Sequence, residues 1–150
     1  MPVEKLEYNT HKHNGLDGTT PIKQASFQTV TINGSNAATA ANYGVFFIAR
    51  DNCVVVDAYE VHSVAGTDGG SVSLQIERLQ GNEALNSGDV LLTTAFNLKS
   101  TANIPVRGEI IKTNRVNSLK AGDRLALKDS GTLTSLSGVC VTVTIEYIYA

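Results

Sequence analysis

Two histidines separated by a single residue, His11 and His13, are the first positions whose types and spacing could support chemistry. On an extended segment, residues two apart point to the same side, so both imidazoles could bind one transition-metal ion. Two ligands do not complete a metal site, but three chains meeting on a threefold axis would supply enough nitrogen ligands. The other interpretation is a pair of solvated histidines in a flexible arm, and the residues alone leave both open.

A second candidate combines a carboxylate and an imidazole on one predicted strand. Glu60 and His62 have the same parity, so their side chains share one face of that strand. Such a pair could perform acid–base catalysis. A structural role, either solvent-facing or hydrogen-bonded, is the favoured interpretation, and the same holds for Asp57 in the same segment.

The chain has two cysteines, Cys53 and Cys140. Without a recognisable signal peptide, reduced thiols are expected, and a free cysteine commonly behaves as a small buried hydrophobic residue. A nucleophilic role would need a base nearby, and nothing in the sequence places His62 beside either thiol. The sequence therefore predicts two buried thiols.

Signatures of catalysis and nucleotide binding are missing from the chain. It contains no G-x-S-x-G, P-loop, C-x-x-C or H-E-x-x-H motif, and no G-x-G-x-x-G between a strand and a helix. Asp68, Asp89 and Asp123 each lie beside a glycine in a predicted turn and match no calcium loop, so turn formation accounts for all three. We expect no catalytic site and no enzymatic activity.

The charge balance and the apolar runs exclude two further classes of function. Twelve Lys and Arg against fourteen Asp and Glu give a net charge of −2, which disfavours a nucleic-acid partner because such proteins usually cluster basic residues. The chain starts without the apolar region of a secretory signal. Its longest apolar run, 45–49, is far shorter than the ~20 residues that span a bilayer. We expect a protein made in the cytosol and not inserted in a membrane.

The elements that must position these residues are predicted to be β-strands. Residues 1–23 are polar and show no period, which indicates an extended N-terminal arm. From residue 24 onwards, alternating or β-branched segments are separated by turn signals, which predicts a β-sandwich domain over 24–150. The predicted strands cover 24–32, 44–49, 53–64, 71–79, 90–96, 107–113, 124–128 and 139–149.

About eight strands joined by turns predict an antiparallel sandwich or barrel. The last strand is the most regular, with Val139, Val141, Val143 and Ile145 on one face. The continuous apolar run of 44–49 predicts a strand buried on both faces. Few charges protect the predicted strands from edge pairing, so we expect copies of the same chain to cover part of this surface.

Two parts of the chain resemble bacteriophage virion proteins. Residues 11–18, HKHNGLDG, resemble an H-x-H-x-G-x-D-G segment found near the start of many phage fibre and decoration proteins. The stretches 65–79, 119–127 (with its sequence AGDRLAL) and 139–147 are similar to jelly-roll domains of phage head-fibre and tail-fibre proteins, and to trimeric jelly rolls of the tumour-necrosis-factor kind. The resemblance covers most of the chain, but the chain lacks the long repetitive shaft of a fibre.

This resemblance implies an all-β, jelly-roll-like antiparallel β-sandwich with an extended N-terminal arm, assembled as a homotrimer. It also implies that His11 and His13 bind an iron ion on the trimer axis, as H-x-H pairs do in some phage fibres. The expected function is that of a non-enzymatic virion structural protein, a trimeric capsid decoration or head-fibre protein. Its arm would grip the major capsid protein, another virion protein or a neighbouring subunit.

The alternative function is the carbohydrate- or receptor-binding tip of a tail fibre, with a host-surface glycan as partner. Its site would lie on loops, where Tyr43, Tyr147 or Tyr149 could stack on sugars. Packing of these tyrosines in the core or in a trimer interface is the simpler interpretation. A third hypothesis, a small depolymerase, would need paired carboxylates in a cleft, and the sequence contains no motif for them.

Overall fold

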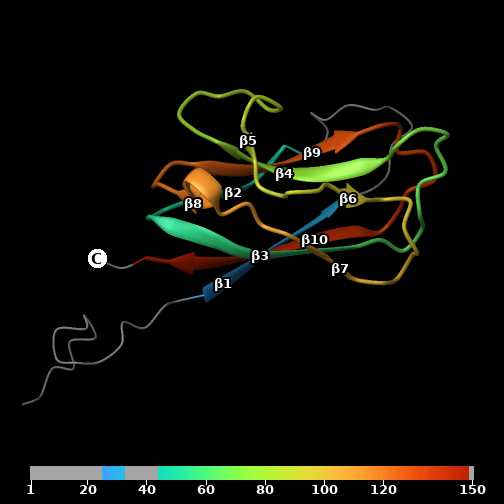
Figure 1. Cartoon of the computed structure of the whole chain (residues 1–150), viewed down its shortest axis with the longest axis horizontal. Coiled ribbons are helices and arrows are strands. Elements are labelled where there is room, and N and C mark those ends of the chain that lie inside the picture. Colours follow the sequence, from blue (N-terminus) through green and yellow to red (C-terminus); the bar gives the residue numbers. More distant parts are fainter. Residues whose placement is uncertain (1–24, 33–43, 149–150) are drawn as a thin grey trace, which may run out of the picture.

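Two antiparallel β-sheets packed face to face make up the computed structural model, which describes residues 25–32 and 44–148 (Figure 1). The first sheet has the strand order β1-β10-β3-β7, with β8 also paired to β3, and the second has the order β2-β9-β4-β5, with β6 also paired to β4. The elements are β1 (Ala25–Ile32), β2 (Val45–Ile48), β3 (Cys53–Val61), β4 (Ser73–Leu79), β5 (Asp89–Val90), β6 (Phe96–Asn97), β7 (Val106–Gly108), the 3-10 turn η2 (Thr113–Arg115), β8 (Ser118–Leu119), β9 (Arg124–Ser130) and β10 (Val139–Tyr147).

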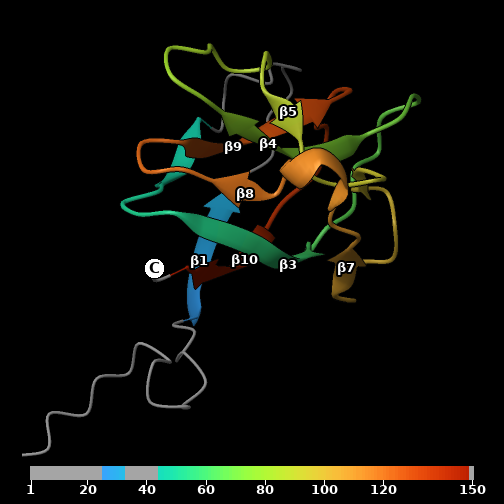
Figure 2. The ribbon, with the colours of Figure 1, turned by 60° about the vertical axis from the view of Figure 1, so that its left-hand side comes forward.

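The connectivity is that of a jelly-roll-like sandwich. Strands β1 to β4 alternate between the two sheets, and the late strands return to pair with them. β10 lies between β1 and β3, and β9 lies between β2 and β4, with antiparallel pairing throughout (Figure 2). This arrangement closes the sandwich with strands far apart in sequence. It confirms the predicted all-β fold class.

The core lies between the inner faces of the two sheets. In β10, Val139, Val141, Val143 and Ile145 are all fully buried, as their alternation predicts. The opposing sheet contributes apolar side chains from β4 and β9 in the same alternating manner, namely Leu74, Ile76, Leu125 and Leu127. The period of two in each strand therefore selects the side chains that leave water on folding.

The prediction that 44–49 is buried on both faces is wrong. Among the described strands, β2 lies at the edge of the second sheet and pairs with β9 alone. Phe47 points into the core, but Ile48 is 60% exposed and Val45 is 39% exposed. An apolar run cannot reveal an edge position, because the number of neighbouring strands is a property of the assembled sheet.

Two other predicted strands, 90–96 and 107–113, are interrupted. The first is divided into two short strands, β5 and β6. In the second, only the beginning is a strand, β7, and η2 starts at the end of the predicted segment. Between these short strands the two segments pair with each other, since Thr93 N–H donates to the Glu109 carbonyl and Ile111 N–H donates to the Leu91 carbonyl. Both segments change partner midway, so neither remains a single strand.

The remaining boundaries agree with the prediction to within a few residues, except that β9 extends to Ser130 and β8 was not anticipated. The predicted arm, with His11 and His13, lies outside the described residues, as do Tyr43 and Tyr149. No helix within residues 25–32 and 44–148 is long and apolar enough to cross a bilayer.

Candidate functional site

The carboxylate and imidazole predicted to share a face form a sealed pair at the end of β3. Glu60 and His62 are both fully buried, and His62 Nδ1 lies 2.9 Å from Glu60 Oε1. The other ring nitrogen, Nε2, lies 3.0 Å from the backbone carbonyl oxygen of Ser100. Of the two structural alternatives, the hydrogen-bonded one is correct and the solvent-facing one is wrong. A pair with no exposed atom cannot reach a substrate.

Burial disfavours the ionised form of two carboxyl groups, those of Glu60 and Asp129. It raises the pKa of Glu60 above the ordinary value, although the hydrogen bond and charge of His62 act in the opposite direction. It also raises the pKa of Asp129 on β9, whose two carboxylate oxygens are buried and have no hydrogen-bond partner among the described residues. A carboxyl group with a raised pKa favours folding when protonated, so its contribution is present at acidic pH and is lost as pH rises through the folded-state pKa.

We therefore expect Asp129→Asn to stabilise the protein at pH 8 and to have little effect at pH 4. The amide keeps the shape of the side chain but removes the ionised form that burial disfavours. Urea denaturation at both pH values, with the exposed Asp51→Asn as the control, measures this difference. Equal stabilisation at both pH values would contradict the assignment to the buried charge.

The two cysteines differ in their surroundings. Cys53 is fully buried, and burial, together with the nearby Asp123 and Asp51, raises the pKa of its thiol to about 11. This thiol is therefore protonated and unreactive at neutral pH. Cys140 is only half-buried, because it faces away from the core in β10. The prediction of two buried thiols is correct for Cys53 and wrong for Cys140.

The aspartates of the predicted turns make local contacts. Asp68 Oδ2 accepts a hydrogen bond from Thr132 N–H, and Asp123 Oδ2 accepts one from Lys120 N–H. Asp89 forms an ion pair with Arg78. No group of three or more His, Cys, Asp or Glu side chains within the described ranges is arranged to hold a metal ion.

The chain's own loop, 80–88, folds over the part of the outer face of the second sheet that carries Glu77. Glu77 is fully buried there, and its carboxylate accepts hydrogen bonds from Asn86 N–H at 2.7 Å and Gly88 N–H at 3.2 Å. From β9, Arg124 donates to the carbonyls of Gly81 and Glu83. Alternation along β4 places Glu77 on the side opposite Leu74 and Ile76, but alternation alone cannot show that a loop folds over that side.

Among the described residues, no loop folds over the outer face of β3 and β10 in the first sheet. Its side chains from β3 and β10 are half-buried or exposed, and no described segment crosses them (Figures 1 and 2). These residues, Val54, Val56, Asp57, Tyr59, Val61, Cys140, Thr142, Thr144 and Glu146, are named the uncovered face below. Only Asp57 and Glu146 among them carry a formal charge, and Asp57 is paired with Arg107 at 2.9 Å.

A pocket opens on the flank of the sandwich beside a bulge in β3. β10 pairs Thr144 with Asp57 and Ile145 with Val55, so Val56 is an extra residue. On the other side of β3, β7 pairs with residues 58–60 and β8 with residues 53–54. Between these two pairings the segment 109–113 moves away from β3. The space that this departure leaves is the pocket.

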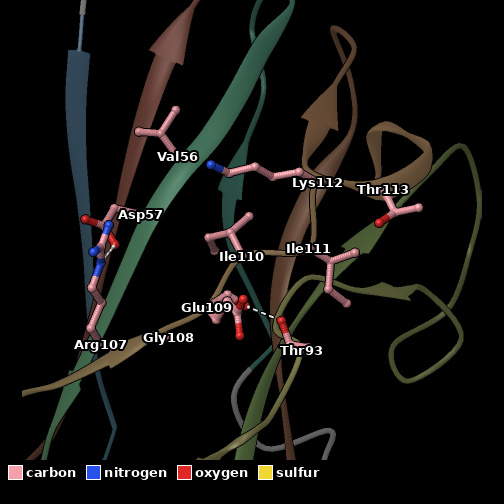
Figure 3. A pocket seen from close by; sticks show the side chains of 10 residues that line it. All are labelled: Val56, Asp57, Thr93, Arg107, Gly108, Glu109, Ile110, Ile111, Lys112 and Thr113. Carbon is pink, nitrogen blue, oxygen red and sulfur yellow. Dashed lines mark hydrogen bonds and ion pairs between the residues drawn. The ribbon is translucent and has the colours of Figure 1, made fainter.

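The pocket has a volume of about 560 Å³. Figure 3 shows Asp57 and Arg107 on the side of β3, with Lys112 extending towards β3 from the opposite side. Thr93 Oγ1 donates to the Glu109 carbonyl at its base. The full lining is Val56, Asp57, Thr93, Arg107, Gly108, Glu109, Ile110, Ile111, Lys112 and Thr113.

Charged residues around this pocket are visible in the sequence, but the prediction of one continuous strand over 107–113 did not bring them together. Arg107, Glu109 and Lys112 flank the pair Ile110–Ile111, so charged and apolar residues lie close together in this segment. Treated as one continuous strand, 107–113 would spread these side chains over both faces. The change of partner after Gly108 brings them together instead.

Comparison with known proteins identifies the fold. No protein-family model matches the chain, and no curated protein matches it. A chain in the capsid of Ralstonia phage GP4 is similar in structure, with a TM-score of 0.56, 16% sequence identity and coverage of 86% of both chains. A chain in the capsid asymmetric unit of cyanophage Pam1 has a TM-score of 0.54 and 10% identity, over 84% of this chain and 85% of that chain. The protein therefore shares an all-β fold with these two phage capsid chains.

Proposed function

We propose that the protein is a non-enzymatic structural protein of a bacteriophage virion, a trimeric capsid decoration or head-fibre protein. The observation that carries this proposal is the structural likeness to chains of two phage capsids over nearly the whole length of each. Because most of each chain is matched, the likeness involves the complete sandwich rather than a common hairpin. The virion is accordingly its proposed location.

A structural role is also consistent with the chemistry of the described residues. The acid–base pair of Glu60 and His62 is enclosed in protein, and the Cys53 thiol is buried and protonated. The polar groups of the turns are engaged in holding the backbone. These groups stabilise the sandwich, and none of them combines exposure with the activated form that a catalytic group needs.

The uncovered face supports self-association as the means of assembly. Its side chains are chiefly valine and threonine, and its central carboxylate is neutralised within the chain by Arg107. Proteins that expose such a surface commonly bury it against a partner. We assign this partner to further copies of the same chain, because few charges on this face would oppose its contact with a copy of itself.

Addition of the purified protein to phage heads that lack it tests the capsid role. We expect the protein to co-sediment with the heads and to saturate at a fixed number of copies per head, because symmetric attachment sites are limited in number. The same protein lacking residues 1–23 should lose this binding while keeping its sandwich fold. Binding to tails but not to heads would favour the tail-fibre alternative, and binding to neither would contradict the proposal.

A further inference from the structure

The flank pocket is not explained by a role in assembly. It lies beside the bulge of β3 and shares Val56 and Asp57 with the uncovered face, but the rest of its lining, Thr93 and residues 107–113, lies outside that face (Figure 3). Its volume of about 560 Å³ is in the range of small-ligand sites, roughly 300–1,000 Å³. A concave site of this size with several polar side chains is a candidate ligand-binding site.

Several polar groups in the pocket are available to a ligand. The Lys112 ammonium, the Glu109 carboxylate and the Thr113 hydroxyl have no hydrogen-bond partner among the described residues, and Arg107 uses only Nε in its contact with Asp57. These groups surround an apolar floor formed by Val56, Ile110 and Ile111. The pocket therefore offers both donors and acceptors above a surface suited to carbon–hydrogen groups.

The charge balance selects the chemistry of the ligand. Two cations, Arg107 and Lys112, are matched by two carboxylates, Asp57 and Glu109. A phosphate or other anion would approach both carboxylates, and a cation would approach both basic groups, so neither is favoured by Coulomb interactions. A hydroxyl group donates and accepts at once, and it can use an ammonium on one side and a carboxylate on the other.

We propose that this pocket binds a neutral saccharide. Vicinal hydroxyls of the sugar would bridge Glu109 and Lys112, and its apolar face would lie on Ile110 and Ile111.

A glycan microarray of neutral and acidic oligosaccharides from bacterial surface polysaccharides tests the proposal on the full chain. We expect binding to one or more neutral glycans, followed by an increase in Kd of about tenfold or more in Lys112→Ala and in Glu109→Gln, because each change removes a charged hydrogen-bond partner of the sugar. The controls Lys120→Ala and Asp51→Asn remove the same charges at exposed positions outside the pocket and should leave Kd unchanged.

Three results would overturn the saccharide assignment. The first is the absence of binding to every glycan, and the second is binding that the two pocket variants leave intact. The third is binding confined to acidic glycans and weakened strongly by salt, which would identify an anion site. If the pocket variants instead lose co-sedimentation with phage heads, the pocket is a protein contact. Unchanged thermal unfolding of both variants will show that the fold is retained.

Discussion

Replacing Thr144 with lysine is expected to reduce the solution mass of the protein from about three chain masses to one. Thr144 is half-buried in the middle of the uncovered face, directly opposite Asp57 in the β10–β3 pairing. In a single chain the new ammonium remains in water beside a carboxylate, so the sandwich should still fold. In a trimer built on this face, one buried lysine per copy would lose its hydration, at a cost of several kcal/mol for each charge.

Light scattering over a range of concentrations measures this effect. The matched control is Ser130→Lys, which places the same charge at an exposed position at the end of β9 in the second sheet. The control should keep the trimer mass. A wild-type protein that is monomeric at every concentration would contradict the homotrimer, and a Thr144→Lys variant that stays trimeric would show that trimers form through another surface.

The same measurement in the presence of a chelator addresses His11 and His13. If these histidines hold an iron ion on the trimer axis, the chelator should lower the mass, and His11→Ala should do the same without chelator. A trimer that persists in both cases would leave the histidines without a role in assembly. The metal would then have no part in holding the trimer together, while the role of the uncovered face would stand.

Replacing Gly131 with alanine is expected to destabilise the fold by about 3 kcal/mol or more. Gly131 follows β9 with a φ of +88°, and an added Cβ would collide with the backbone carbonyl oxygen of Ser71. The left-handed conformation alone costs an ordinary residue about 1–2 kcal/mol. The collision adds to this cost, because the neighbouring atoms belong to the backbone beside β4 and cannot rotate away.

Gly122 provides the control for this substitution. Its φ of +93° is nearly the same, but nothing lies within 4 Å of an added Cβ. Gly122→Ala should therefore lower the free energy of unfolding only by the cost of the left-handed conformation, about 1–2 kcal/mol. Urea denaturation at one protein concentration compares the two variants, since the stability of an oligomer depends on concentration. Equal losses in the two variants would contradict the close approach of residues 71 and 131.

The sequence by itself determined the parts of this fold that depend on local period and local turns. The alternation of Val139, Val141, Val143 and Ile145 identified the buried face of β10, because successive side chains of any strand point to opposite sides. The turns around Asp68 and Asp123 were recognised from their glycine neighbours for a similar reason. Both features are set by residues close together in the chain, so no tertiary information was needed.

Only the tertiary structure decided which polar groups are buried and where a ligand can enter. Glu77 alternates like a surface residue, yet loop 80–88 folds over it and supplies two N–H donors. The apolar run of 44–49 predicts that Ile48 is a core residue, yet β2 is an edge strand and leaves it exposed. The pocket arises because residues 107–113 change strand partner after Gly108. In each case the outcome depends on which distant segment packs against the residue, and that is a property of the assembled sheets rather than of the local sequence.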